Sequence, residues 1–157
     1  MTKDEFMARV LAMQDRLYRV SYSMLPNPHD QDDAVQECAR IALQKMGTLR
    51  DARYLETWLV RILINECNSI LRKHKREGPT EEMEIVLPPD GDREVIEALM
   101  TLEVRLRLPI VLNYIEGYTV KEIAGMLRVP ESTVKTRMAR ARKLLRETLA
   151  EGGLENA

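Results

Sequence analysis

Histidine, cysteine and aromatic residues are scarce in this chain of 157 residues, which has two histidines, two cysteines and only 4% aromatic side chains. His29 and His74 lie in polar segments, with no nucleophile, phosphate-binding loop or metal-ligand spacing beside them. Cys38 and Cys67 stand far apart in helical patterns, where they are expected to be small buried apolar residues. We therefore expect no catalytic site, no cofactor, no metal and no small-molecule substrate.

Long apolar runs are also missing. No segment is long and apolar enough to span a membrane, and nothing resembles a signal peptide. The sequence therefore predicts a reduced, cytoplasmic protein. The formal net charge is −1, so the charge of the whole chain does not indicate whether it binds nucleic acid.

The charge is unevenly distributed along the chain. Between Glu77 and Glu103 the only basic residue is Arg93, among many carboxylates, while the segments on either side have an excess of Lys and Arg. Glycine and proline are frequent within residues 77–92, which is typical of a flexible linker. The pattern predicts two basic modules joined by an acidic connector.

Helical periodicity accounts for nearly all of the remaining sequence. Before residue 117 we expect helices at residues 3–25, 30–46, 52–76, 93–102 and 105–116. The helix at residues 52–76 should bury Leu55, Leu59, Ile62, Leu63 and Ile70. No segment shows the alternating pattern of a strand more clearly than the helical pattern. The predicted fold is therefore all-α with two small helical domains.

A short helix, a brief turn and a longer basic helix are expected at the C-terminal end. Thr119 is placed to cap the short helix, and Glu122 three residues later completes a capping box. Pro130 cannot continue a helix interior but is well suited to the residue before a new helix. This succession predicts a helix-turn-helix motif, with its second helix at residues 131–149.

The second helix of this motif has one apolar and one basic side. Its apolar side holds Val134, Met138, Ala141, Leu145 and Leu149. The opposite side has short or basic residues, namely Thr136, Ala139, Arg140 and Lys143, with Lys135 and Arg146 beside them and Arg137 and Arg142 on the flanks. Such a face fits the major groove of DNA. An amphipathic helix exposed to solvent would have the same distribution of apolar and basic residues. The short helix that precedes residues 131–149 favours DNA binding instead.

Two polar stripes are expected in the N-terminal half. The helix at residues 30–46 has Asp33, Gln36, Glu37 and Arg40 on its outer side, which is either a solvated face or a docking surface for a protein. The helix at residues 52–76 aligns Tyr54, Trp58, Arg61, Asn65 and Arg72. Aromatic and basic groups on one face suit single-stranded nucleic acid, although Tyr54 and Trp58 could equally be core residues.

These segments, in this order, resemble the sigma factors of bacterial RNA polymerase, specifically the extracytoplasmic-function (ECF) group of the sigma-70 family. The resemblance covers nearly the whole chain. It rests on Asp33-Ala-Val-Gln-Glu37, Thr57-Trp-Leu-Val-Arg-Ile62 with Asn65, Glu116-Gly-Tyr-Thr-Val-Lys-Glu-Ile-Ala124 and the segment from Ser132 to Arg142. One departure is that the family's Leu-Pro-x-x-Tyr-Arg element reads Leu102-Glu-Val-Arg-Leu-Arg107 here.

The resemblance implies a division of the chain into region 2 at residues 1–76, a linker at 77–92 and region 4 at 93–151. Region 2 would bind the clamp helices of the largest polymerase subunit and open the promoter at the minus-10 element. Region 4 would read the minus-35 duplex and touch the polymerase flap. The linker would thread towards the RNA exit path. An anti-sigma factor is the expected regulator, and it could hold the protein at the membrane.

The resemblance also assigns the stripes to partners. Asp33, Gln36, Glu37 and Arg40 would bind polymerase, and Tyr54, Trp58, Arg61, Asn65 and Arg72 would act at the minus-10 element. In the last helix Lys135, Thr136, Ala139 and Arg140 would face minus-35 bases, and Thr133, Arg137, Arg142 and Lys143 would hold phosphates.

A free-standing regulator of the response-regulator output type is the alternative binding protein. It would explain residues 104–149 but not the N-terminal half, which lacks the alternating strands of a receiver domain. Dependence on core polymerase for strong specific DNA binding distinguishes the two.

Overall fold

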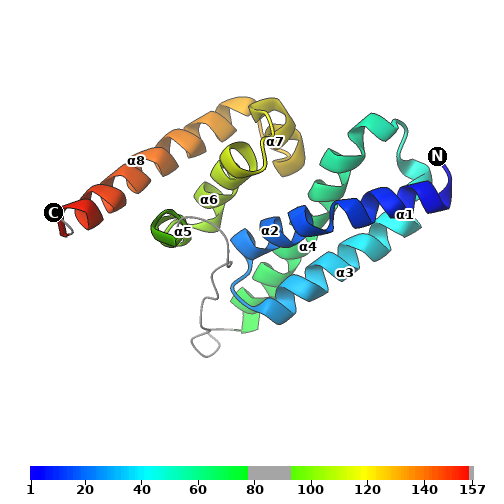
Figure 1. The fold of residues 1–157 in the computed structure, drawn as a ribbon, viewed down its shortest axis with the longest axis horizontal. Coiled ribbons are helices and arrows are strands. Elements are labelled where there is room, and N and C mark those ends of the chain that lie inside the picture. The colour runs from blue at the N-terminus through cyan, green and yellow to red at the C-terminus, as the bar shows by residue number, and fades with distance from the viewer. Residues whose placement is uncertain (78–92, 156–157) are drawn as a thin grey trace. The chain divides into compact units, whose positions relative to one another are not determined.

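The computed structural model describes residues 1–77 and 93–155, and of residues 152–155 only the backbone. The predicted linker at 77–92 therefore lies, apart from Glu77, outside the described residues. The described residues form helices and connecting turns without a strand, and the chain divides into two compact units, Met1–Ile85 and Val86–Ala157 (Figure 1). The all-α prediction with two helical domains is therefore confirmed. Within the described residues, no helix is long and apolar enough to cross a membrane.

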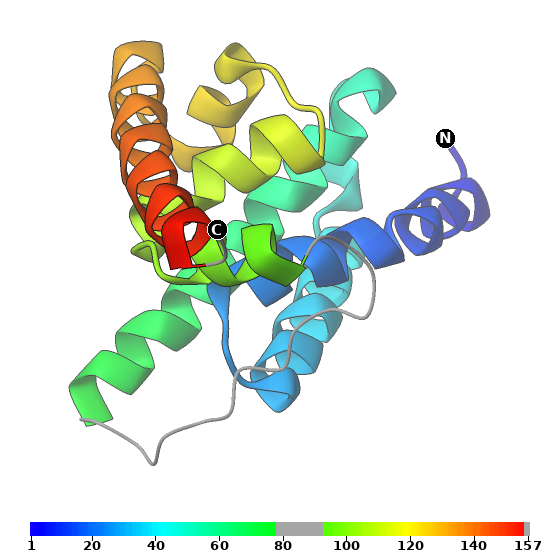
Figure 2. The same cartoon turned by 60° about the vertical axis from the view of Figure 1, so that its left-hand side comes forward.

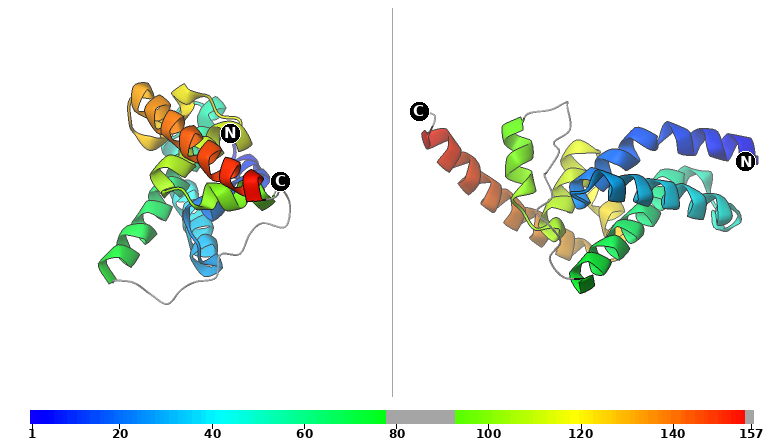
Figure 3. Two further views of the ribbon diagram at one scale, coloured as in Figure 1. Left: turned by 90° about the vertical axis from the view of Figure 1, so that its left-hand side faces the viewer. Right: turned by 90° about the horizontal axis from the view of Figure 1, so that it is seen from below.

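The first unit is a helical bundle. Its elements are α1 (Lys3–Ala12), α2 (Gln14–Met24), α3 (Pro28–Gln44), the short 3-10 helices η1 (Met46–Thr48) and η2 (Ala52–Tyr54), and α4 (Leu55–Glu77). α3 packs along α4, and α2 contacts both, while α1 continues roughly in the direction of α2 (Figures 1 and 3). The helix expected at residues 3–25 is divided at Met13. There the backbone N–H of Met13 donates to the carbonyls of Val10 and Leu11, which are nearer in sequence than the partner in a regular α-helix.

The start of α3 is set by its capping residues. The Asn27 side chain accepts from the His29 N–H at 2.8 Å, and Pro28 occupies the first turn, so the helix begins two residues before the predicted Asp30. Asp30 in turn contacts His74 on α4 at 2.7 Å. This contact joins the beginning of α3 to the end of α4.

α4 supplies the centre of the first core. Leu55, Leu59 and Leu63 are fully buried as predicted, but Ile62 and Ile70 are only half-buried. The helix turns Val60, Ile64 and Cys67 inwards instead, because α2 and α3 cover α4 from two sides and widen its buried face. Cys38 and Cys67 are free thiols and both are buried, as expected. Burial raises the pKa of each thiol to about 12.

The second unit is organised around the last helix. It comprises α5 (Arg93–Met100), α6 (Val104–Ile110), the π-helical turn η3 (Val111–Ile115), α7 (Val120–Leu127) and α8 (Glu131–Glu155). α6, α7 and α5 all pack against α8 (Figure 2). The single helix expected at 105–116 changes to π-helical register after Pro109, which has no N–H to donate to the Arg105 carbonyl.

The helix-turn-helix is present at the expected residues. Thr119 and Glu122 form the predicted capping box at 3.1 and 3.0 Å, and α8 begins directly after Pro130. Between the helices Arg128 adopts a left-handed backbone conformation (φ 56°), which ends α7 and was not predicted because this conformation favours glycine.

Candidate nucleic-acid and protein interfaces

α8 presents the predicted basic face to solvent. Val134, Met138 and Ala141 are buried, at 0, 4 and 0% exposure, against the rest of the unit. Lys135, Thr136, Ala139, Arg140 and Lys143 are all exposed, while Thr133, Arg137 and Arg142 are half-buried on the flanks. The helical wheel therefore describes α8 correctly as far as Ala141, whereas Leu145 and Leu149 are only half-buried.

Thr136 lies near the middle of this exposed face. Its hydroxyl donates to the Ser132 carbonyl at 2.9 Å, so its proton is already used within the helix. The side chain then offers a methyl group and an acceptor oxygen to a ligand. With Ala139 one turn further on, it forms a low, partly apolar strip between Lys135 and Arg140, where a thymine methyl group could fit.

The predicted minus-10 residues share one face of α4 and differ in exposure. Tyr54 is 60% exposed, just before the first turn of the helix, and Asn65 and Arg72 are exposed further along it. Trp58 is half-buried, with its ring 6.1 Å from that of Phe6 in an edge-to-face arrangement. The Nε of Arg61 is buried without a hydrogen-bond partner, so this guanidinium keeps an unused donor.

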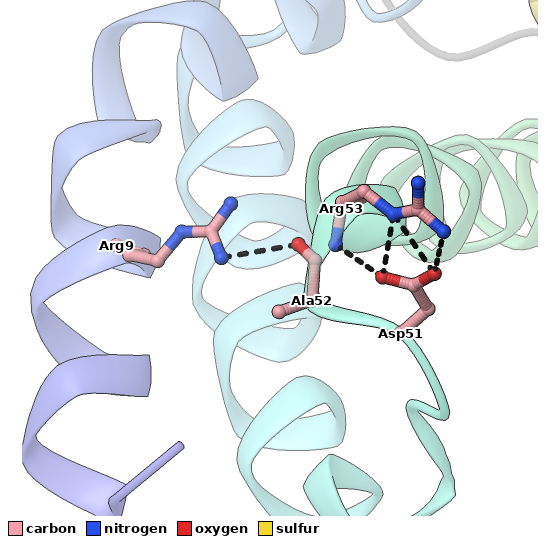
Figure 4. Close-up of polar contacts among 4 residues, drawn as sticks. All are labelled: Arg9, Asp51, Ala52 and Arg53. Carbon is pink, nitrogen blue, oxygen red and sulfur yellow. Dashed lines mark hydrogen bonds and ion pairs between the residues drawn. The ribbon is translucent and has the colours of Figure 1, made fainter.

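The turn that leads into α4 is held by charged side chains (Figure 4). Asp51 accepts from the Arg53 N–H at 2.9 Å and pairs with the Arg53 guanidinium at 2.7 Å. These contacts lower the pKa of Asp51, the side-chain hydrogen bond more than the backbone one. From α1, Arg9 donates to the Ala52 carbonyl at 3.0 Å. Sequence reasoning did not identify this cluster, because the bond from Arg9 to Ala52 joins residues 43 positions apart.

The polar stripe on α3 lies beside a carboxyl group of α4. Asp33, Gln36 and Arg40 are exposed, and Glu37 is half-buried and paired with Arg40, with 3.0 Å between Arg40 Nε and Glu37 Oε2. This hydrogen bond lowers the pKa of Glu37. Burial is the largest cause that raises the pKa of Glu66, and the Glu37 carboxylate raises it further. Arg40 and Lys45 lower the pKa but do not cancel this effect. Glu66 therefore extends the charged stripe from α3 onto α4.

An apolar groove of about 400 Å³ opens on the second unit. Six apolar residues line it, from α5, α6, η3 and α8: Val95, Leu99, Ile110, Tyr114, Ile115 and Leu145. Tyr114 and Ile115 are 63 and 54% exposed. Arg142 and Arg146 stand at the same groove, so Arg142, expected at phosphate, is also placed to contact a protein.

The helical periodicity of residues 105–116 predicts that Ile115 packs inwards together with Leu108, Val111 and Leu112, and this prediction is wrong for Ile115. The π-helical turn at residues 111–115 changes this register, and the side chains of Tyr114 and Ile115 are both exposed. Exposed neighbouring apolar residues beside a groove are typical of a binding site.

The fold and its exposed faces define a DNA-binding protein of the helix-turn-helix class with a second, helical unit. Two family models match the chain: sigma-70 region 2 at residues 10–77 and sigma-70, region 4 at residues 92–145. The chain belongs to the sigma-70 family of RNA polymerase sigma factors, in its extracytoplasmic-function group. Members of this group are transcription initiation factors that act with core polymerase at promoters.

Individual relatives agree over most of the chain. The chain is 31% identical to the ECF RNA polymerase sigma factor SigW of Bacillus subtilis, with 95% of this chain and 91% of SigW covered. It is 32% identical to RNA polymerase sigma factor SigV of Bacillus subtilis, with 87% and 86% covered. The sigma factor RpoE from Bartonella quintana, solved in complex with the anti-sigma factor NepR, superposes with a TM-score of 0.82 at 26% identity, covering 93% of this chain and 97% of RpoE.

Proposed function

We propose that the two units of this chain share promoter recognition, with residues 1–76 acting at the minus-10 element and residues 93–151 at the minus-35 element. The observation that carries the proposal is the geometry of α8. Its buried Val134, Met138 and Ala141 fix the helix against the unit, so the short and basic residues opposite them form a continuous exposed face. The chain itself performs no catalysis and supplies binding energy to the polymerase.

On α8 the base-reading residues are Lys135, Thr136, Ala139 and Arg140, and the phosphate contacts are Thr133, Arg137, Arg142 and Lys143. Residues near the N-terminal half of a recognition helix reach deepest into the major groove. Arg140 is long enough to donate to guanine across the low surface of Ala139, whereas Lys143 lies one turn further along the helix.

Arg140→Ala and Lys143→Ala form a matched pair that tests this assignment, since each removes one exposed charge from α8. In a selection from randomised promoters with core polymerase, Arg140→Ala should change the preferred minus-35 sequence at one position, at a cost of about 1–3 kcal/mol. Lys143→Ala should leave the preferred minus-35 sequence unchanged. It should reduce the slope of log binding constant against log salt concentration by about one. An unchanged preference in Arg140→Ala would assign this residue to phosphate.

On the first unit, Asp33, Gln36, Glu37 and Arg40 form the surface that docks on the polymerase clamp helices. The charges of this stripe are held in place by the Glu37–Arg40 pair, and Glu66 continues the stripe onto α4. An arrangement of fixed charges gives specificity and a faster association with a partner of complementary charge.

Reversing the charge of Glu37 should weaken binding to core polymerase. Glu37→Lys places two cations side by side, and we expect a loss of about ten-fold or more in a competition assay against unlabelled wild-type chain. The double variant Glu37→Arg, Arg40→Glu keeps an ion pair on α3 but exchanges its two charges, so it should also bind poorly. Wild-type affinity in the double variant would show that the pair only stabilises α3.

The face of α4 with Tyr54, Trp58, Arg61, Asn65 and Arg72 acts on the separated minus-10 strand. Exposed Tyr54 offers a ring for base stacking, and the positive charges of Arg61 and exposed Arg72 are suited to backbone phosphate. The edge contact of Trp58 with Phe6 fixes the orientation of its ring relative to α1. Fixed aromatic groups lose little conformational entropy when a base stacks on them.

The apolar groove on the second unit takes an apolar helix of the polymerase flap. Its floor provides six apolar residues, and Arg142 and Arg146 would pair with acidic residues beside that helix. Docking of both units on polymerase fixes the separation of two weak DNA sites, which raises the effective concentration of each at its promoter element.

The proposed location is the cytoplasm, where core polymerase works. RpoE of Bartonella quintana has been solved with the anti-sigma factor NepR, and we extend that mode of regulation to this chain. An anti-sigma factor would cover the α3 stripe and the groove. A membrane-bound anti-sigma factor would also hold the chain at the membrane.

A further inference from the structure

α1 contacts the start of α4 with two side chains outside the minus-10 set. Phe6 is fully buried and meets the Trp58 ring edge-on at 69°. Three residues along α1, Arg9 donates from Nη1 to the Ala52 carbonyl oxygen at 3.0 Å (Figure 4). The contacts thus join the first helix of the chain to η2, which ends at Tyr54, and to the first turn of α4, which holds Trp58.

The peptide between Ala52 and Arg53 is held at both ends. Its carbonyl accepts from Arg9 and from the backbone N–H of Leu55. Its N–H donates to Asp51 Oδ1 at 2.9 Å. Because a three-residue 3-10 helix has few hydrogen bonds of its own, these outside contacts set the path of the backbone into Tyr54.

Tyr54 is the residue that this turn presents. Its backbone N–H donates to the Asp51 carbonyl at 3.1 Å, and its own carbonyl accepts from Thr57 Oγ1 at 3.1 Å. The Arg53 guanidinium, held by Asp51, lies 5.9 Å from the centre of the Tyr54 ring. The backbone of Tyr54 is therefore held on both sides, and its ring lies beside a cation while it stays 60% exposed.

We propose that Arg9 is a positioning residue for the minus-10 strand, which fixes the Ala52–Arg53 peptide so that the Tyr54 ring is oriented to stack on an unpaired base. The inference rests on the proposed function of the α4 face. It makes α1 part of the promoter-opening surface, although Arg9 need not touch DNA. Pre-orientation strengthens stacking because less freedom is lost on binding.

The test measures how holoenzyme binds a fluorescent single-stranded oligonucleotide with the non-template minus-10 sequence found in the promoter selection. Tyr54→Ala should weaken binding about ten-fold. Arg9→Ala should weaken it about five-fold, the effect of one lost hydrogen bond to the backbone. In the Tyr54→Ala background, Arg9→Ala should have an effect of less than about two-fold, because its action passes through the ring. Arg9→Lys, which keeps a donor, should recover most of the affinity.

Lys3→Ala is the matched control, since it removes one exposed positive charge from the same helix. It should bind like wild type; a loss equal to that of Arg9→Ala would make charge the cause and overturn the inference. Equal effects of Arg9→Ala in both backgrounds would also overturn it, as would a lowered melting temperature with weakened core binding. If Tyr54→Ala weakens binding and Arg9→Ala does not, only the role of Arg9 fails. If Tyr54→Ala has no effect, the proposed minus-10 face fails with it.

Discussion

Replacing Arg107 with methionine should destabilise the second unit by about 3–5 kcal/mol, because it removes charge-assisted hydrogen bonds of about 1.5–3 kcal/mol each, and this is a large share of the stability of a small domain. Arg107 is buried on α6, and its guanidinium donates to the carbonyls of Leu99, Met100 and Leu102 at 3.0, 3.2 and 2.6 Å. The Leu99 and Met100 carbonyls lie at the end of α5, and the Leu102 carbonyl lies in the turn between α5 and α6. Methionine fills similar space but donates no hydrogen bond, so the carbonyls lose a shared donor.

The measurement is urea denaturation of the full chain, followed by helical circular dichroism and by limited proteolysis of the second unit. Arg105→Met is the control, because Arg105 lies on the same helix, is exposed and contacts Glu103 only at 3.6 Å. Its free energy of unfolding should change by less than about 0.5 kcal/mol. A similarly small change in Arg107→Met would show that α5 is held by packing alone.

Arg107 also explains how region 4 begins without the family's Pro and Tyr. Glu103 and Leu106 stand at those two positions, and Glu103 forms no side-chain cap on α6. The Leu and Arg of the motif, at Leu102 and Arg107, are retained, and the structure joins them by the 2.6 Å bond from Arg107 to the Leu102 carbonyl. The start of α6 is therefore held by a buried side-chain contact that does not require the proline.

The sequence predicted those features that depend on one helix at a time. The capping box of Thr119 and Glu122 and the buried side of α8 followed from spacing alone, because such contacts join residues within two turns. The incomplete burial of Ile62 and Ile70 depends on which neighbouring helices cover α4, which the sequence of one helix does not indicate. Periodicity gives the direction of a side chain but not what lies opposite it.

The surfaces that sequence reasoning missed have the same origin. The bond between Arg9 and Ala52 requires that α1 pass the start of α4, which no local pattern indicates. The groove requires the π-helical turn and three further helices to meet. A weak local signal existed in Pro109, since a proline inside a helical pattern indicates a disturbed register nearby, but it does not specify a π-helical turn.

Aspartate in place of Ile115 should abolish docking of the second unit on polymerase and leave DNA reading intact. Ile115 is 54% exposed on η3, so its replacement has little effect on the core of the unit. A carboxylate there must be desolvated when an apolar helix enters the groove, which we expect to weaken the contact by at least about 2–4 kcal/mol. Transcription from a promoter that depends on its minus-35 element should then fall about 30-fold or more.

Three measurements separate this effect from its alternatives. Leu11→Asp adds the same charge at a comparably exposed apolar residue, 62% exposed on α1 and outside the groove, and should transcribe like wild type. Without polymerase, the Ile115→Asp chain should bind a minus-35 duplex as weakly as the free wild-type chain does, as measured by fluorescence anisotropy at low salt, because α8 keeps its exposed basic face. On a promoter already opened at minus-10, where region 2 is sufficient, Ile115→Asp should recover most of its activity. Equal losses on both promoters would place the defect in folding, and full activity on the minus-35-dependent promoter would exclude the groove as the site of docking.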